Sequence, residues 1–112
     1  MIISTTMDVN GFKVVEYRGL VRGVIVRAPT IMQGLMTGLK NMVGGKIGAL
    51  TTMCETARQQ AYDLMLAHAQ ELGADAVIGV RYDASQVAGE KYTATEVLCY
   101  GTAVKLQKLS QQ

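Results

Sequence analysis

Residues 12–27 read FKVVEYRGLVRGVIVR, and this stretch decides the fold. Apolar and charged residues alternate along it as far as Gly23, which is the period-two pattern of a strand with one buried face. Residues 24–26 are all apolar, so we expect this end of the strand to be covered on both faces. Gly19 lies four residues before Gly23, and a glycine within a strand often marks a bulge or the close approach of another backbone. We therefore predict one long strand that bends at Gly19 or Gly23.

The residues before this strand predict a shorter one. Residues 2–6 are mainly β-branched, as in a brief first strand. Asn10-Gly11 follows, and this dipeptide is the strongest short-range signal of a β-hairpin. We therefore expect a hairpin turn between the short strand and the long one.

Two helices are expected after the long strand. The first follows Pro29, carries an apolar stripe over residues 31–42 and ends at a pair of glycines. The second begins at Thr52, which forms a capping-box pattern with Glu55, and Gly73 supplies its C-terminal stop. Both helices are long enough to pack an apolar face against a sheet.

Two further strands complete the predicted fold. Residues 74–82 contain a short buried strand, residues 83–91 are small and polar as in a loop, and residues 93–106 form the last strand. The resulting order, β-β-α-α-β-β, predicts a two-layer α+β sandwich with both helices on one face of a mostly antiparallel sheet. Residues 1–112 show no linker and no internal repeat, so we expect a single domain.

The composition limits both the core and the choice of partners. Apolar residues make up 49% of the chain but aromatic residues only 5%, so the core buries little area per residue and association with further copies is favoured. A net charge of +2 is too small to predict binding to nucleic acid or to an anionic membrane. Two widely separated cysteines, without a signal peptide or a long apolar span, indicate a soluble cytoplasmic protein.

The sequence provides no catalytic motif. His68 is the only histidine, so it is the one candidate for a histidine general base. It falls on the apolar stripe of the second helix, where a histidine more often serves as a hydrogen-bonded structural residue. Gly44-Gly45-Lys46 lacks the remaining residues of a phosphate-binding P-loop and follows a helix, so we interpret it as a helix end. We assign no catalytic residue.

Three side chains could bind a thiophilic metal ion: Cys54, Cys99 and His68. Cys54 and His68 are separated along one predicted helix by roughly 21 Å, at 1.5 Å per residue, so they cannot bind the same ion within one subunit. A closed tetrahedral zinc site within a monomer is therefore not expected. In a ring of subunits, however, one cysteine per chain becomes several around an axis.

Several fragments, taken together, resemble the YbjQ family over about residues 2–106. The most specific are Tyr17-x-Gly19-x-Val21-x-Gly23, Leu72-Gly73-Ala74-Asp75-Ala76-Val77-x-Gly79 and Gly101-Thr102-Ala103-Val104. The resemblance implies a small α+β subunit that assembles into a homopentameric ring. It also implies a heavy-metal-binding label and no recognised enzyme activity. The matched positions are glycines, alanines and apolar residues, so the resemblance names no metal ligand.

Three functions are consistent with these observations. The first is a non-enzymatic homo-oligomeric binding module that holds a heavy metal or another small soft ligand at subunit contacts. The second is a structural or partner-binding pentameric ring without a ligand of its own. The third is a hydrolase whose site lies between subunits, in which His68 is the residue to suspect.

Overall fold

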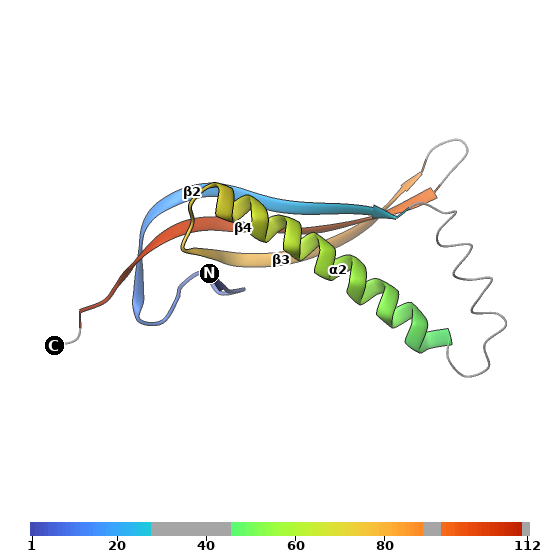
Figure 1. Cartoon of the computed structure of the whole chain (residues 1–112), viewed down its shortest axis with the longest axis horizontal. Helices are drawn as coiled ribbons and strands as arrows, with labels where there is room; N and C mark the ends of the chain where they lie inside the picture. Colours follow the sequence, from blue (N-terminus) through green and yellow to red (C-terminus); the bar gives the residue numbers. More distant parts are fainter. Residues whose placement is uncertain (28–45, 89–92, 111–112) are drawn as a thin grey trace.

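The computed structural model describes residues 1–27, 46–88 and 93–110, which form one helix packed on a four-stranded sheet (Figure 1). The elements are β1 (Ile2–Ile3), β2 (Phe12–Arg27), α2 (Lys46–Glu71), β3 (Ala76–Ala88) and β4 (Thr93–Lys108). The helix predicted over residues 31–42 lies outside the described residues. Within the described part of the chain, the fold is therefore α+β with a single helix.

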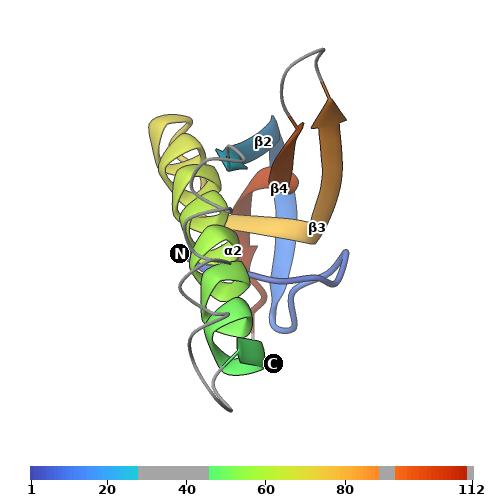
Figure 2. The same ribbon diagram turned by 90° about the vertical axis from the view of Figure 1, so that its right-hand side faces the viewer.

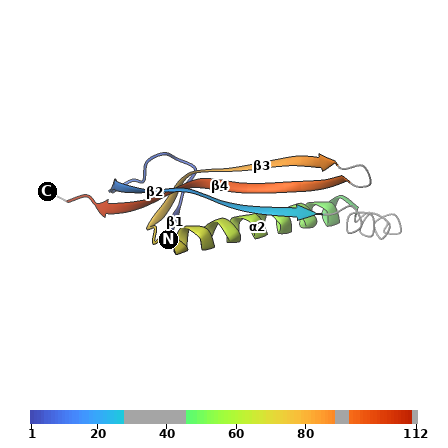
Figure 3. The same cartoon turned by 90° about the horizontal axis from the view of Figure 1, so that it is seen from above.

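The sheet is mostly antiparallel, as the sequence predicts. Its strand order is β1-β3-β4-β2, with β4 antiparallel to both of its neighbours and β1 parallel to β3. Helix α2 covers one face of this sheet, so that the chain forms two layers (Figures 2 and 3). No helix among the residues described combines the length and the apolar character needed to cross a membrane.

The predicted hairpin between the first two strands is wrong. Gly11 does form a turn with a φ of 81°, and the Phe12 backbone N–H donates to the Val9 carbonyl oxygen at 3.1 Å. However, β1 pairs with β3 in register Ile2↔Ala76 and makes no ladder with β2. The signal was correct for the local turn, but a two-residue turn pattern cannot specify which strand becomes the neighbour.

The segment that leads from β1 into β2 crosses to the sheet face opposite α2 (Figure 3). There it covers a small second core, in which three buried side chains pack against three partly buried ones: Ala76, Ile78 and Val104 against Val9, Val14 and Leu106. This segment covers one end of that face. At the other end of the same face, the described residues provide no such cover.

Both predicted roles of the glycines in β2 are confirmed. The pairing of β2 with β4 shifts register between Val14 and Glu16 and again between Tyr17 and Gly19. Gly19 has a φ of 113°, a conformation that favours glycine, so it forms part of the bulge. Gly23 instead lies against α2, where an added Cβ would be 2.0 Å from the Ala61 carbonyl oxygen. One glycine bends the strand, and the other lets the helix approach it.

The main core lies between α2 and the sheet. Its fully buried side chains include Met65 from the helix and Cys99 from β4, and its buried members are alanines, valines, a methionine and a cysteine, with Tyr62 partly buried against them. Two of these small residues, Ala57 and Ala61, share a helix face with Met65. The alanines permit a short distance between helix and sheet, which agrees with the absence of tryptophan and the single phenylalanine.

The start of the helix differs from the capping-box prediction. The chain is already helical at Lys46, so Thr52 lies within α2 and not at its N-terminus. Its hydroxyl donates to the Gly48 carbonyl oxygen one turn earlier, at 3.0 Å. Inside a helix, a threonine hydroxyl can donate to the carbonyl oxygen four residues earlier. The capping-box pattern of Thr52 and Glu55 therefore did not indicate the N-terminus of the helix. The predicted stop is confirmed, because Gly73 follows α2 with a φ of 69°.

The loop predicted over residues 83–91 is wrong in its first part. Strand β3 continues to Ala88 and pairs with β4 along this length, from Asp83↔Leu98 to Ala88↔Thr93. The described side chains of residues 83–86 are exposed, which accounts for their small and polar character. The backbone ladder with β4 stabilises the strand where the side chains provide no apolar pattern.

Candidate functional site

The three predicted metal ligands lie in different environments. Cys54 is exposed on the N-terminal half of α2, and His68 is half-buried near the end of the same helix. Cys99 lies in β4 and is fully buried. Cys54 and His68 share one helix, so the separation expected from their spacing holds within a subunit. No group of three or more histidine, cysteine or acidic side chains close enough to hold a metal ion occurs in the described ranges.

Cys99 is part of the main core. Its Sγ–H donates to the Met65 Sδ at 3.6 Å, between two side chains with no exposed surface. Burial raises the pKa of the Cys99 thiol above its usual value, which a contact with Tyr82 partly opposes. Metals bind the thiolate rather than the thiol, so this environment disfavours Cys99 as a ligand. Cys54 is the accessible thiol.

His68 has a backbone partner in the next layer. Its Nδ1 atom accepts a hydrogen bond from the Arg22 backbone N–H of β2 at 3.3 Å. The acceptor role requires a lone pair on Nδ1, so the proton of the neutral ring lies on Nε2. This bond connects the last turns of α2 to β2. It gives His68 a structural function in the contact between helix and sheet.

A pocket of about 220 Å³ lies near Cys54, between the first half of α2 and the end of the sheet. All three long strands contribute to it. The described residues that line it are mainly apolar or small, but they include two arginines: Met53, Cys54, Ala57 and Arg58 of α2, with Arg27, Ala84, Thr95 and Val97 of the strands. The sequence analysis missed this pocket, because Arg27 and Arg58 lie far apart in the chain and belong to no local motif.

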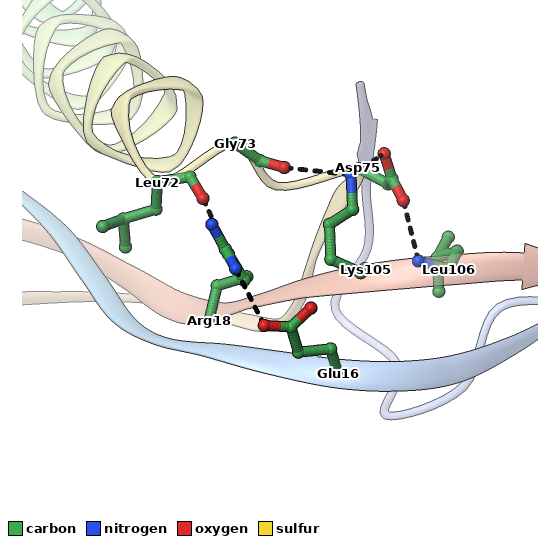
Figure 4. Close-up of polar contacts among 7 residues, drawn as sticks. All are labelled: Glu16, Arg18, Leu72, Gly73, Asp75, Lys105 and Leu106. Carbon is green, nitrogen blue, oxygen red and sulfur yellow. Dashed lines mark hydrogen bonds and ion pairs between the residues drawn. The ribbon is translucent and has the colours of Figure 1, made fainter.

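A cluster of polar contacts connects the C-terminal end of α2 to the sheet (Figure 4). Arg18 donates from Nε to the Leu72 carbonyl oxygen at 2.8 Å and forms an ion pair with Glu16 at 2.8 Å. Beside them, Asp75 accepts the Leu106 backbone N–H at 2.9 Å and pairs with the Lys105 ammonium group at 3.1 Å. These contacts fix the turn between α2 and β3, so we assign them a structural role.

Asp75 provides a prediction about pH. The Leu106 N–H, followed by the hydrogen bond from Lys105, lowers the pKa of the Asp75 carboxyl below its usual value of 3.8. The folded state therefore favours the ionised form, and its contribution to stability is complete above pH 3.8 and is lost as the pH falls below that value. We expect Asp75→Asn to lower stability at pH 7 and to flatten the pH dependence below 3.8.

The measurement for Asp75 is urea unfolding from pH 7 into the acid range at fixed protein concentration. Asp8→Asn, at an exposed position in the segment before β2, is the matched control and should retain the wild-type slope. Equal acid slopes for wild type and Asp75→Asn would contradict the assigned role of this carboxylate.

This chain is similar in sequence to several known proteins. A family model described as "Putative heavy-metal-binding", YbjQ, matches residues 1–107. A UPF0145 protein of Legionella pneumophila is 53% identical over 104 residues, which cover 93% of this chain and 96% of that protein. A UPF0145 protein of Francisella philomiragia is 48% identical over 107 residues, which cover 96% and 100%.

A solved structure agrees with the fold. It is a crystal structure of a protein of unknown function from the DUF74 family of Pediococcus pentosaceus, which matches with a TM-score of 0.62 and 18% identity, over 96% of this chain and 98% of that one. At 18% identity, this similarity supports a shared fold and no shared function. The family model matches residues 1–107, and the UPF0145 protein of Legionella pneumophila aligns with 93% of this chain, so the sequence similarity extends over nearly its whole length. This chain therefore belongs to the YbjQ family, as its sequence fragments suggested.

Proposed function

We propose that this protein is a non-enzymatic homo-oligomeric binding module that holds a soft metal ion through Cys54 thiolates of several subunits. The observation that carries the proposal is an open apolar surface on the sheet face opposite α2. Its apolar part is formed by three side chains of β2, with exposed fractions of 61% for Leu20, 39% for Val24 and 59% for Val26, and the exposed Arg22 lies on the same face between Leu20 and Val24. We call these three residues the open β2 face.

The open β2 face needs a cover that one subunit does not supply from its described residues. Gly23 and Ile25 face α2, so the alternate residues Val24 and Val26 face away from it. The sequence predicts both faces of this segment to be covered. A second copy of the chain would supply the missing layer, as the family resemblance implies for a ring.

The shape of the subunit supports association as well. Its radius of gyration is 18.2 Å, and it extends 63 Å along its longest axis. A compact domain of this length has a radius of about 13 Å. Strand β2 also forms an edge of the sheet over its whole length of 16 residues. Long edges with apolar side chains favour pairing with other chains.

The metal part of the proposal rests on Cys54. It is an exposed thiol on α2, whereas Cys99 is buried and has a raised pKa. Because a subunit supplies one accessible thiol, a site with several thiolates requires several subunits. The family description supports a heavy metal as the ligand, and the accessibility of the thiol supports Cys54 as the residue that binds it.

Native mass spectrometry of protein purified without chelators or an affinity tag tests both parts. We expect the mass of a homopentamer with an excess that disappears on denaturation. Cys54→Ser should retain the oligomer and lose the excess. Val24→Asp, which places a charge on the open β2 face, should release smaller species because burying an unpaired charge is unfavourable.

The outcomes separate the alternatives. A bare oligomer in the wild type would favour a structural or partner-binding ring without its own ligand. Metal uptake that persists in Cys54→Ser would exclude this thiol and direct attention to His68 and Cys99. A wild-type monomer would contradict the proposal as a whole.

A further inference from the structure

The pocket between α2 and the sheet combines an apolar lining with positive charge. Arg27 and Arg58 bring two guanidinium groups to it, and none of its lining residues among those described is acidic. Met53, Ala57 and Val97 supply an apolar wall between them. A volume of about 220 Å³ is below the usual range of drug-sized sites, so it suits a ligand of about one ring.

Arg27 carries a donor that lacks an acceptor. Its Nε atom is buried and has no hydrogen-bond partner within the described part of the chain. Another nitrogen of the same guanidinium, Nη2, donates to the Gln60 side-chain oxygen on α2, which holds the group in place. A buried N–H without an acceptor destabilises a protein, so a small turn of the guanidinium that brings Nε to an acceptor in the pocket that Arg27 lines would remove this penalty.

Arg58 is positioned by an aromatic ring. Its guanidinium carbon lies 5.6 Å from the centre of the Tyr82 ring on β3, within the range of a cation–π contact. The contact is with the face of the ring and uses no acceptor atom, so it does not occupy the N–H donors of Arg58 with a hydrogen bond. A guanidinium edge matches the two oxygens of a carboxylate in a bidentate arrangement.

We propose that this pocket binds a small organic carboxylate with an apolar body, its carboxylate paired with Arg58 and Arg27 and its body against Met53, Ala57 and Val97. A wholly polar anion fits less well, because it would leave the apolar wall without a partner. The site adjoins the proposed metal ligand, because Cys54 lines the same pocket, but neither arginine is a metal ligand and the two proposals are tested by different variants.

Benzoate is the probe, with benzamide as its neutral counterpart and inorganic phosphate as a purely polar anion. Cys54 lines the pocket and is exposed, so in protein freed of metal with a chelator the rate at which a thiol reagent modifies it reports occupancy. Cys99 is buried and reacts after unfolding, which provides an internal reference. We expect benzoate to slow the modification of Cys54 in a saturable manner, and benzamide and phosphate to have at least roughly tenfold weaker effects.

Two variants locate the site. Arg58→Met should weaken benzoate binding by roughly tenfold or more, since it removes a charged hydrogen-bond partner. The matched control Arg22→Met, at an exposed position of β2 outside the pocket, should bind benzoate like the wild type. Ala84→Leu retains both arginines but fills the pocket from an exposed strand position, so benzoate should no longer protect Cys54 in this variant. It also tests the site if Arg58→Met does not fold.

The proposal is overturned if benzoate gives no protection, if benzamide or phosphate protects as well as benzoate, or if Arg58→Met and Ala84→Leu both bind like the wild type. These outcomes do not affect the metal proposal, which native mass spectrometry of the Arg58→Met protein tests separately. A protein that retains its metal but loses benzoate would establish two distinct sites.

Discussion

Gly23→Ala is expected to destabilise the protein by about 3 kcal/mol or more, the largest effect of an added methyl group at any glycine in the described part of the chain. An alanine Cβ at this position would lie 2.0 Å from the Ala61 carbonyl oxygen and 2.6 Å from the Met65 backbone nitrogen. Both atoms belong to the helix backbone, so no side-chain rotation relieves the overlap. The helix must move away from the sheet, and the main core then loses contacts throughout its length.

Gly48→Ala is the matched control for Gly23→Ala. Gly48 lies in α2, and among the described residues outside its own helix backbone an added Cβ there meets no atom within 4 Å. Because alanine is a better helix former than glycine, Gly48→Ala should stabilise the protein by up to about 1 kcal/mol. Urea unfolding of both variants at one protein concentration measures the two effects. Similar midpoints for Gly23→Ala and the wild type would show that helix and strand do not approach as closely as described.

Met65→Ala should destabilise the protein by about 2–5 kcal/mol. Met65 is fully buried at the centre of the main core, where its sulfur accepts the Cys99 thiol proton. Truncation opens a cavity between helix and sheet and leaves that thiol without its acceptor. The same substitution should also increase access to Cys99, so the native protein should gain a second thiol that reacts with a modifying reagent.

Met65→Leu distinguishes packing from the contact between the two sulfurs. Leucine restores most of the volume but cannot accept the thiol proton, and volume-conserving exchanges usually change stability by less than about 1.5 kcal/mol. We therefore expect Met65→Leu to lie close to the wild type both in urea unfolding and in thiol reactivity. A leucine variant as unstable as the alanine variant would show that the sulfur contact, and not the filled volume, stabilises the core.

The long strand was the most predictable part of the fold. Residues 12–23 show period-two alternation, and the positions of Gly19 and Gly23 indicated a bulge and a close approach. The alternation placed Val15 and Tyr17 on the same buried face as Val21, and this was wrong, since both are exposed and only Val21 is buried. These are local properties of backbone sterics, so the sequence expresses them directly. The partners of the strands could not be predicted in the same way. The pairing of Ile2 with Ala76 depends on which sheet edge is free after the rest has folded.

The candidate site was only partly predictable for a similar reason. Residue chemistry selected Cys54, Cys99 and His68, but burial decides which of the thiols is accessible, and burial depends on tertiary packing. The pocket has no sequence signature, because Arg27 and Arg58 meet only when α2 packs on the end of the sheet. The polar residues 83–86 misled the prediction, since a ladder with β4 needs no apolar side chains.

The pairing of β2 with β4 has a consequence for biosynthesis. Phe12 at the start of β2 pairs with Lys108 at the end of β4, and every ladder bond of β2 is made to that strand. At about 5–20 residues per second, β2 therefore emerges from the ribosome several seconds before its intramolecular partner. During this interval its backbone groups and apolar side chains are available to nascent chains on neighbouring ribosomes of the same messenger. The order of synthesis thus gives copies of this protein an opportunity to meet before any one of them has closed its own sheet.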